Sequence, residues 1–136
     1  MEPKVSTFLF PSKPDSIGKV EAFVEDLKDR YDIRDDVFGN ILISITEAAN
    51  NAIIHGNRCD ESKEVSIDVS YNVDSKVLTF KVQDQGEGFD FNNLPDPTSP
   101  ENLEKITGRG VFLMKQLADW VIFADSGSQV ELQFRL

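Results

Sequence analysis

The chain has 136 residues, enough for one domain that buries a core without disulfides or a metal. Its net charge of −10 at pH 7 argues against a nucleic-acid backbone as a partner, because phosphate neutralisation needs clustered Lys and Arg. One cysteine and one histidine cannot build a disulfide or a zinc site within one chain. Without an apolar leader or an uninterrupted apolar run approaching a membrane span, a cytoplasmic protein is expected.

The first part of the chain predicts a strand and then a helix. The strand covers residues 4 to 10. In the residues that follow, apolar side chains recur at the spacing of an amphipathic helix: Ile17, Val20, Val24, Leu27 and Tyr31.

A second helix is predicted over residues 41 to 55, with Gly56 as its C-cap. Its buried stripe leaves Glu47 and Asn51 clear, one turn apart and about 5–6 Å from each other. Asn51 could ligate magnesium beside a nucleoside triphosphate while Glu47 accepts a proton. Taken alone, such a pair is more often an ordinary solvated surface pair.

A hairpin follows, with apolar residues alternating over 65–71 and 77–83 around a turn at 74–75. Asp84 closes the second strand, where a carboxylate can accept a hydrogen bond from a donor such as the exocyclic amine of adenine. Gly86 and Gly88 let the backbone turn sharply and approach a ligand. This segment alone is also typical of a Gly-rich turn leaving a strand.

Residues 90–107 contain three prolines among polar residues and predict a long loop, which beside a nucleotide would be a lid. Gly108 and Gly110 then precede a predicted helix from Val111, whose free N–H groups can receive a phosphate. Lys105 and Arg109 bring positive charge to the same place. A last hairpin is predicted over 120–125 and 130–136 around Gly127.

These elements predict one α+β domain over residues 1–136. It is a two-layer α/β sandwich, with helices on one face of a mixed, mainly antiparallel sheet. No P-loop motif occurs, and neither Gly-rich segment completes a dinucleotide-binding fingerprint. The chain also lacks the His-Arg-Asp catalytic loop of a eukaryotic-type protein kinase.

Segments 47–51, 84–88 and 108–110 together resemble the N-box, the Asp-x-Gly-x-Gly box and the Gly-x-Gly box of the GHKL (Bergerat-fold) ATPases. Within that superfamily, segments 44–56 and 108–119 are most similar to the bacterial anti-sigma-factor serine/threonine kinases, which have a histidine kinase-like ATPase domain. The resemblance runs nearly end to end. It implies the Bergerat fold, with ATP and Mg²⁺ bound at the three boxes.

The resemblance also implies residue roles. Glu47 would be the general base, Asn51 the magnesium ligand and Asp84 the adenine contact. Ser128 stands where the family often has a threonine near adenine, and either Lys105 or Arg109 would reach the γ-phosphate. Four glycines would shape the nucleotide site: Gly86, Gly88, Gly108 and Gly110.

The function implied is that of a kinase that binds a sigma factor, holds it off RNA polymerase and phosphorylates a STAS-domain anti-anti-sigma protein. A homodimer is expected from the same resemblance. Two alternatives stay open. One is a nucleotide-gated binding module with little phosphoryl transfer, and the other is a stand-alone ATPase domain related to histidine kinases. The latter is the weaker, because no dimerisation helix with a phospho-acceptor histidine occurs.

Overall fold

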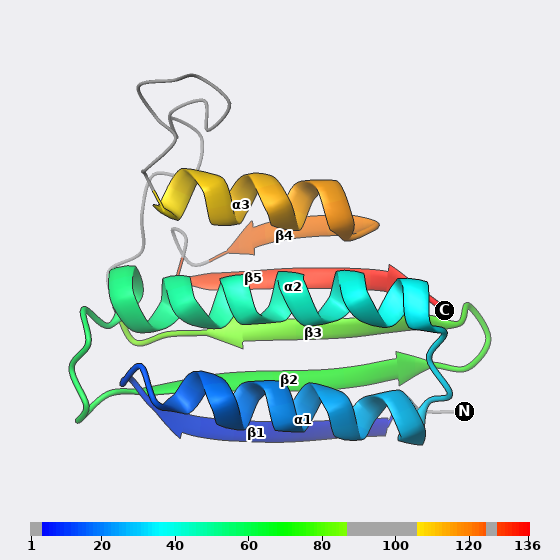
Figure 1. Ribbon diagram of the computed structural model, residues 1–136, viewed down its shortest axis with the longest axis horizontal. Coiled ribbons are helices and arrows are strands. Elements are labelled where there is room, and N and C mark those ends of the chain that lie inside the picture. Colours follow the sequence, from blue (N-terminus) through cyan, green and yellow to red (C-terminus); the bar gives the residue numbers. More distant parts are fainter. Residues whose placement is uncertain (1–3, 87–105, 125–127) are drawn as a thin grey trace.

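The computed structural model describes the backbone of residues 4–86, 106–124 and 128–136, and the side chains of 6–86, 110–124 and 128–136. Within these ranges a five-stranded sheet carries the helices on one of its faces (Figure 1). The elements in chain order are β1 (Lys4–Pro11), α1 (Ser16–Arg30), α2 (Asp35–Asn51), the π-helical turn η1 (Ala52–Gly56), β2 (Glu64–Asn72), β3 (Val77–Gln83), α3 (Ile106–Leu117), β4 (Trp120–Ala124) and β5 (Gln129–Arg135).

The strands lie in the order β1-β2-β3-β5-β4. The four pairings between these strands are antiparallel, in agreement with the mainly antiparallel sheet predicted. Alternate residues of each central strand face the helices, because successive side chains of a strand point to opposite faces. These residues form the centre of the core: Val65, Ile67, Val69, Leu78, Phe80, Val82, Val130, Leu132 and Phe134.

Helix α2 is the central helix of the covering layer and packs against both α1 and α3. Its predicted stripe is buried as expected: Ile41, Ile45, Ala48 and Ala52. The helix begins at Asp35, six residues before the predicted start at 41. Asp35 and Asp36 form an acidic first turn, which suits the positive end of the helix dipole but adds nothing to an apolar stripe.

The end of α2 differs from the simple helix end predicted. The backbone widens into the single π-helical turn η1, in which the N–H of Asn57 donates to the carbonyl of Ala52 at 2.8 Å. The next two residues, Arg58 and Cys59, have positive φ angles of 53° and 58°, which non-glycine residues seldom adopt. Single π turns inside helices occur frequently at functional sites.

By length and mean hydropathy alone, Asp35–Gly56 would pass for a membrane-spanning helix. Most of its apolar side chains instead belong to the core described above or pack against it, with Ile43 and Ile54 exposed, and Glu47 and Asn51 lie within the same segment. The hydropathy of this helix therefore reflects its position between α1, α3 and the sheet.

Gly108 and Gly110 were predicted to precede the helix that starts at Val111. That prediction is wrong, because α3 begins at Ile106 and both glycines lie inside its first turns. The predicted lid, residues 90–107, lies outside the described residues except for its last two positions. Gly127 also lies outside them. The end of α2, the end of β3 and the start of α3 lie at the same end of the molecule, on the left in Figure 1. This end carries the candidate site.

Candidate functional site

Helices α2 and α3 meet at Gly110, directly opposite the predicted catalytic pair. A Cβ atom on Gly110 would lie 3.0 Å from Glu47 Oε2 and 3.0 Å from Asn51 Nδ2. That spacing is tighter than an ordinary van der Waals contact, so a side chain at this position would require Glu47 or Asn51 to shift by a few tenths of an ångström. The structure thus brings together two segments that the sequence separates by more than fifty residues.

Asn51 is buried with 8% of its surface exposed, yet neither Nδ2 nor Oδ1 finds a hydrogen-bond partner among the described residues. Buried polar groups are normally paired, because an unpaired amide has lost water without a replacement. An amide in this position fits a role in holding a ligand. Its oxygen is a suitable magnesium donor, so the residue present here fits the predicted metal.

Asp84 lies at the end of β3 with 8% of its surface exposed. Its backbone N–H donates to the carbonyl of Ser128 at 2.9 Å, and its Oδ1 accepts from the N–H of Gly86 at 2.8 Å. Burial raises the pKa of this carboxyl, while the Gly86 N–H and the charge of Lys63 act in the opposite direction. A buried carboxylate with remaining acceptor capacity can receive a donor from a ligand.

Two glycines allow the backbone at the end of η1 to touch the turn that follows β3. A Cβ on Gly56 would overlap the Asp84 carboxyl group, and a Cβ on Gly86 would overlap the Gly56 carbonyl. Gly56 was predicted only as a helix cap. Its contact with Asp84 gives it a place in the site that the local sequence pattern did not indicate.

A small cavity of about 20 Å³ separates α2, α3 and the β3–β5 pair. Its polar lining comes from Asn51 and Ser128, so the two residues predicted to lie near the nucleotide share one space. Ser128 is buried just before β5, and its Oγ accepts a long hydrogen bond of 3.4 Å from Gln83 Nε2. The rest of the lining is apolar: Ala48, Ala52, Val82, Met114, Phe123 and Val130.

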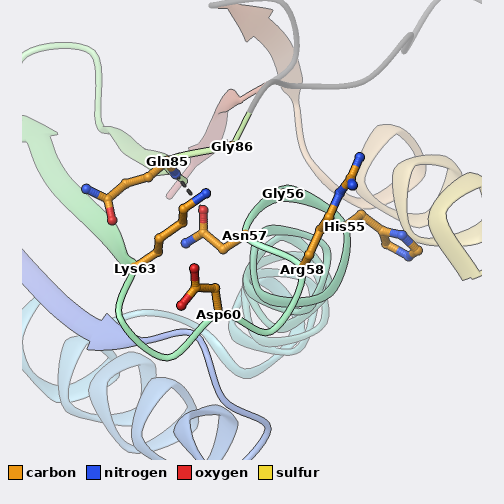
Figure 2. Close-up of a pocket in the computed structure, with 8 residues that line it drawn as sticks. All are labelled: His55, Gly56, Asn57, Arg58, Asp60, Lys63, Gln85 and Gly86. Atoms are coloured by element: carbon orange, nitrogen blue, oxygen red, sulfur yellow. Dashed lines mark hydrogen bonds between the residues drawn. The ribbon is translucent and has the colours of Figure 1, made fainter.

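A larger and more polar cavity, of about 370 Å³, opens where η1 ends (Figure 2). Neither Glu47 nor Asn51 lines it, and among the predicted site residues within the described ranges only Gly86 does. Burial lowers the pKa of His55 at its edge, which favours the neutral imidazole. Of the two residues predicted to do the chemistry, Asn51 lines only the smaller cavity, and Glu47 lines neither. The lining of the larger cavity is His55, Gly56, Asn57, Arg58, Asp60, Lys63, Gln85 and Gly86.

Some predicted site residues are placed only in part. The backbone of Gly108 and Arg109 lies in the first turn of α3. Gly88 and Lys105 lie outside the described residues, so the choice between Lys105 and Arg109 at the γ-phosphate stays a prediction.

A family model described as a histidine kinase-like ATPase domain matches residues 10–134. The chain belongs to this family. It is 30% identical over 129 residues to serine-protein kinase RsbW of Bacillus licheniformis, covering 90% of this chain and 79% of that protein. It is 34% identical over 117 residues to the anti-sigma F factor of Clostridium perfringens, covering 82% of this chain and 79% of that protein.

Among solved structures, the chain resembles the crystal structure of the RsbU and RsbW domains of a Mycobacterium tuberculosis protein. The TM-score is 0.69 at 15% sequence identity, over 98% of this chain and 32% of that chain. The chain thus spans about a third of the chain in that structure. The predicted superfamily and the predicted α+β sandwich are both confirmed.

Proposed function

We propose that this protein is an ATP-dependent serine/threonine kinase that acts as an anti-sigma factor and phosphorylates a STAS-domain anti-anti-sigma protein. The names of its relatives, serine-protein kinase RsbW and anti-sigma F factor, support the kinase activity and the anti-sigma role. Family membership supports ATP as the phosphoryl donor.

One observation carries the proposal: the buried amide of Asn51, which has no partner among the described residues and lies with Glu47 against Gly110. A surface pair on an ordinary helix would be solvated on both side chains. Here one member is buried and unpaired at a helix–helix contact, so these residues are arranged to receive a ligand rather than water.

The residues of this chain suit phosphoryl transfer in distinct ways. Glu47 is half-buried and can accept the proton of an attacking serine hydroxyl. Asp84 can accept a hydrogen bond from the exocyclic amine of adenine. The first turn of α3 offers backbone N–H groups to phosphate. Asn51 would hold Mg²⁺, which when bound neutralises negative charge that develops on the phosphates.

The partners and location follow from the same proposal. The sigma factor would bind a surface that includes neither Asn51 nor Asp84, and competition with the STAS-domain protein would release it. Action on a sigma factor places the protein in the cytoplasm. A homodimer is part of the proposal by analogy with the family.

Transfer of the γ-phosphate tests the proposal. The purified protein is incubated with Mg-ATP labelled at the γ-phosphate and with STAS-domain proteins of the same genome. We expect phosphoserine or phosphothreonine on one of them. Glu47→Ala should lower the transfer rate by about 10²–10⁴-fold with nucleotide binding retained. Nucleotide binding with no transfer to any of these proteins would instead favour a nucleotide-gated binding module.

A further inference from the structure

Asn57 is the most highly connected buried polar side chain at the end of η1. Only 1% of its surface is exposed. Its Nδ2 donates to Ser12 Oγ at 2.7 Å and to the carbonyl of Glu64 at 3.1 Å. Its Oδ1 accepts from the backbone N–H of Gln85 at 2.7 Å, the bond drawn as a dashed line in Figure 2. Both the oxygen and the nitrogen of the amide are therefore engaged.

These bonds join segments that lie far apart in the sequence. Ser12 follows β1, Glu64 begins β2 and Gln85 follows β3, whereas Asn57 follows the helix that carries Glu47 and Asn51. Ser12 is itself fixed, because its N–H and its hydroxyl both donate to the carbonyl of Lys63, at 3.1 and 2.6 Å. Asn57 thus links the end of the N-box helix to three ends of strands.

The bond to Gln85 lies inside the turn that sets the position of Asp84. The N–H of the next residue, Gly86, donates to the Asp84 carboxylate, and the backbone of Gly56 packs against that same carboxylate. Asn57 therefore holds one residue of the turn while its neighbour Gly56 closes the space behind Asp84. If the Gln85 N–H loses its acceptor, the turn loses the side-chain bond that joins it to the residue directly after η1.

From this geometry we propose that Asn57 is a positioning residue for base recognition, acting through Asp84. The inference rests on the proposed function, in which Asp84 accepts the exocyclic amine of adenine. Asn57 itself touches neither the base nor the phosphates in this scheme. Loss of the Asn57 side chain should mainly reduce the discrimination between purines, because a displaced Asp84 carboxylate no longer accepts a hydrogen bond from the exocyclic amine of adenine.

The test measures dissociation constants for Mg-ADP and Mg-IDP by calorimetry. Hypoxanthine carries a carbonyl in place of the exocyclic amine, so it presents an acceptor at the position where adenine would present its donor to Asp84. We expect the wild type to prefer ADP by at least about tenfold. Asn57→Ala should weaken ADP binding by about tenfold and leave IDP binding within about twofold, so that the preference disappears.

Asn72→Ala is the matched control. The Asn72 side chain also accepts from backbone N–H groups in a turn, those of Asp74 at 3.0 Å and Ser75 at 3.1 Å, but it lies in the β2–β3 hairpin at the opposite end of the sheet. It should leave both dissociation constants unchanged. Ser12→Ala removes one acceptor of the Asn57 amide without touching the turn, and should reduce the ADP preference by about threefold.

The outcomes separate the two proposals. Absence of nucleotide binding by the wild type would refute the ATP site and this inference with it. Wild-type binding without a preference for ADP would refute the inference while leaving the kinase proposal intact. A parallel loss of ADP and IDP affinity in Asn57→Ala would also overturn it, because that is the effect of general loosening. If Asn57→Ala does not fold, as judged by circular dichroism, an unchanged preference in Ser12→Ala overturns the inference.

Discussion

Two opposing demands meet on the carboxyl group of Asp84. Burial at the end of β3 disfavours its ionised form, and the Gly86 N–H and Lys63 compensate only in part. Recognition of an amine donor needs the ionised form, which is the better acceptor. The apo protein therefore carries a destabilising charge at neutral pH, and that cost is tied to the proposed role of this side chain.

Replacing Asp84 by Asn should accordingly stabilise the apo protein at neutral pH while weakening ADP binding. The folded-state pKa of Asp84 is raised above 3.8, so the folded state holds its proton more tightly than the unfolded chain. Wild-type stability then falls as pH rises from about 3.8 through the raised pKa. Thermal melting of both proteins from pH 3 to pH 8 should show the advantage of Asp84→Asn appearing across that window. If the melting temperature of the wild type instead increased relative to that of Asp84→Asn as pH rises, the prediction would be wrong.

The backbone contact between Gly56 and Asp84 predicts a large effect from a single methyl group. Gly56→Ala should lower stability by about 1–3 kcal/mol and weaken nucleotide binding, because the Cβ overlaps the carboxyl group. Urea unfolding and ADP titration measure the two effects. Gly39→Ala is the matched control: Gly39 lies within α2 with open space around it, and the change should stabilise by about 0.5–1 kcal/mol. Equal stabilities of the two variants would rule out the contact.

At the scale of the element, the position of α3 depends on the contact of its Gly110 with Glu47 and Asn51 of α2. Gly110→Ala improves helix propensity by about 1 kcal/mol but crowds Glu47 Oε2 and Asn51 Nδ2. We expect the free energy of unfolding to change by less than about 1 kcal/mol and the phosphoryl-transfer rate to fall by about 10²-fold, since small misplacements of reacting groups are costly. Single-turnover transfer measures the rate. A variant as active as the wild type would show that α3 does not constrain the pair.

Element types could be predicted from the sequence because one physical signal dominates each of them. Alternation of apolar residues marks β2, β3 and β5, and the stripe from Ile41 to Ala52 marks α2. The apolar pattern did not predict that α2 starts at Asp35 and α3 at Ile106, because polar first turns and glycines weaken such a pattern. The π-helical turn η1 has no local signature of its own.

The site was predictable to the extent that its residues lie in short motifs. Glu47, Asn51 and Asp84 were predicted this way, and the structure groups the first two with Gly110. Asn57 escaped because its partners, Ser12, Glu64 and Gln85, are set by strand pairing and not by sequence neighbours. Long-range hydrogen bonds become visible only once the register of the sheet is known.

Across the whole molecule, the site depends on α2, α3 and the end of β3 holding the same arrangement at once. A nucleotide that binds only this arrangement stabilises the folded state, by about 2.7 kcal/mol at a hundredfold excess over its dissociation constant. Mg-ADP should thus raise the melting temperature by roughly 5–10 °C. In Asn51→Ala we expect no magnesium-dependent part of this shift, and an apo protein at least as stable as the wild type because a buried unpaired amide is gone. Calorimetric scans with and without magnesium decide both points.

Lys4, where the described part of β1 begins, and Leu136 lie on the side of the molecule away from Asp84. Lys4, the first residue of β1, pairs with Tyr71, and the N–H of Leu136 donates to the carbonyl of Lys76 at 2.9 Å, next to the β2–β3 hairpin (Figure 1). Strand β3 runs from this side of the molecule to Asp84, and its length places the two roughly 20 Å apart. A surface tether, a fluorophore or a fused reporter attached on this side of the molecule, for example at Leu136, would therefore lie away from the proposed nucleotide site. Immobilised or labelled protein can serve directly in the binding measurements described above.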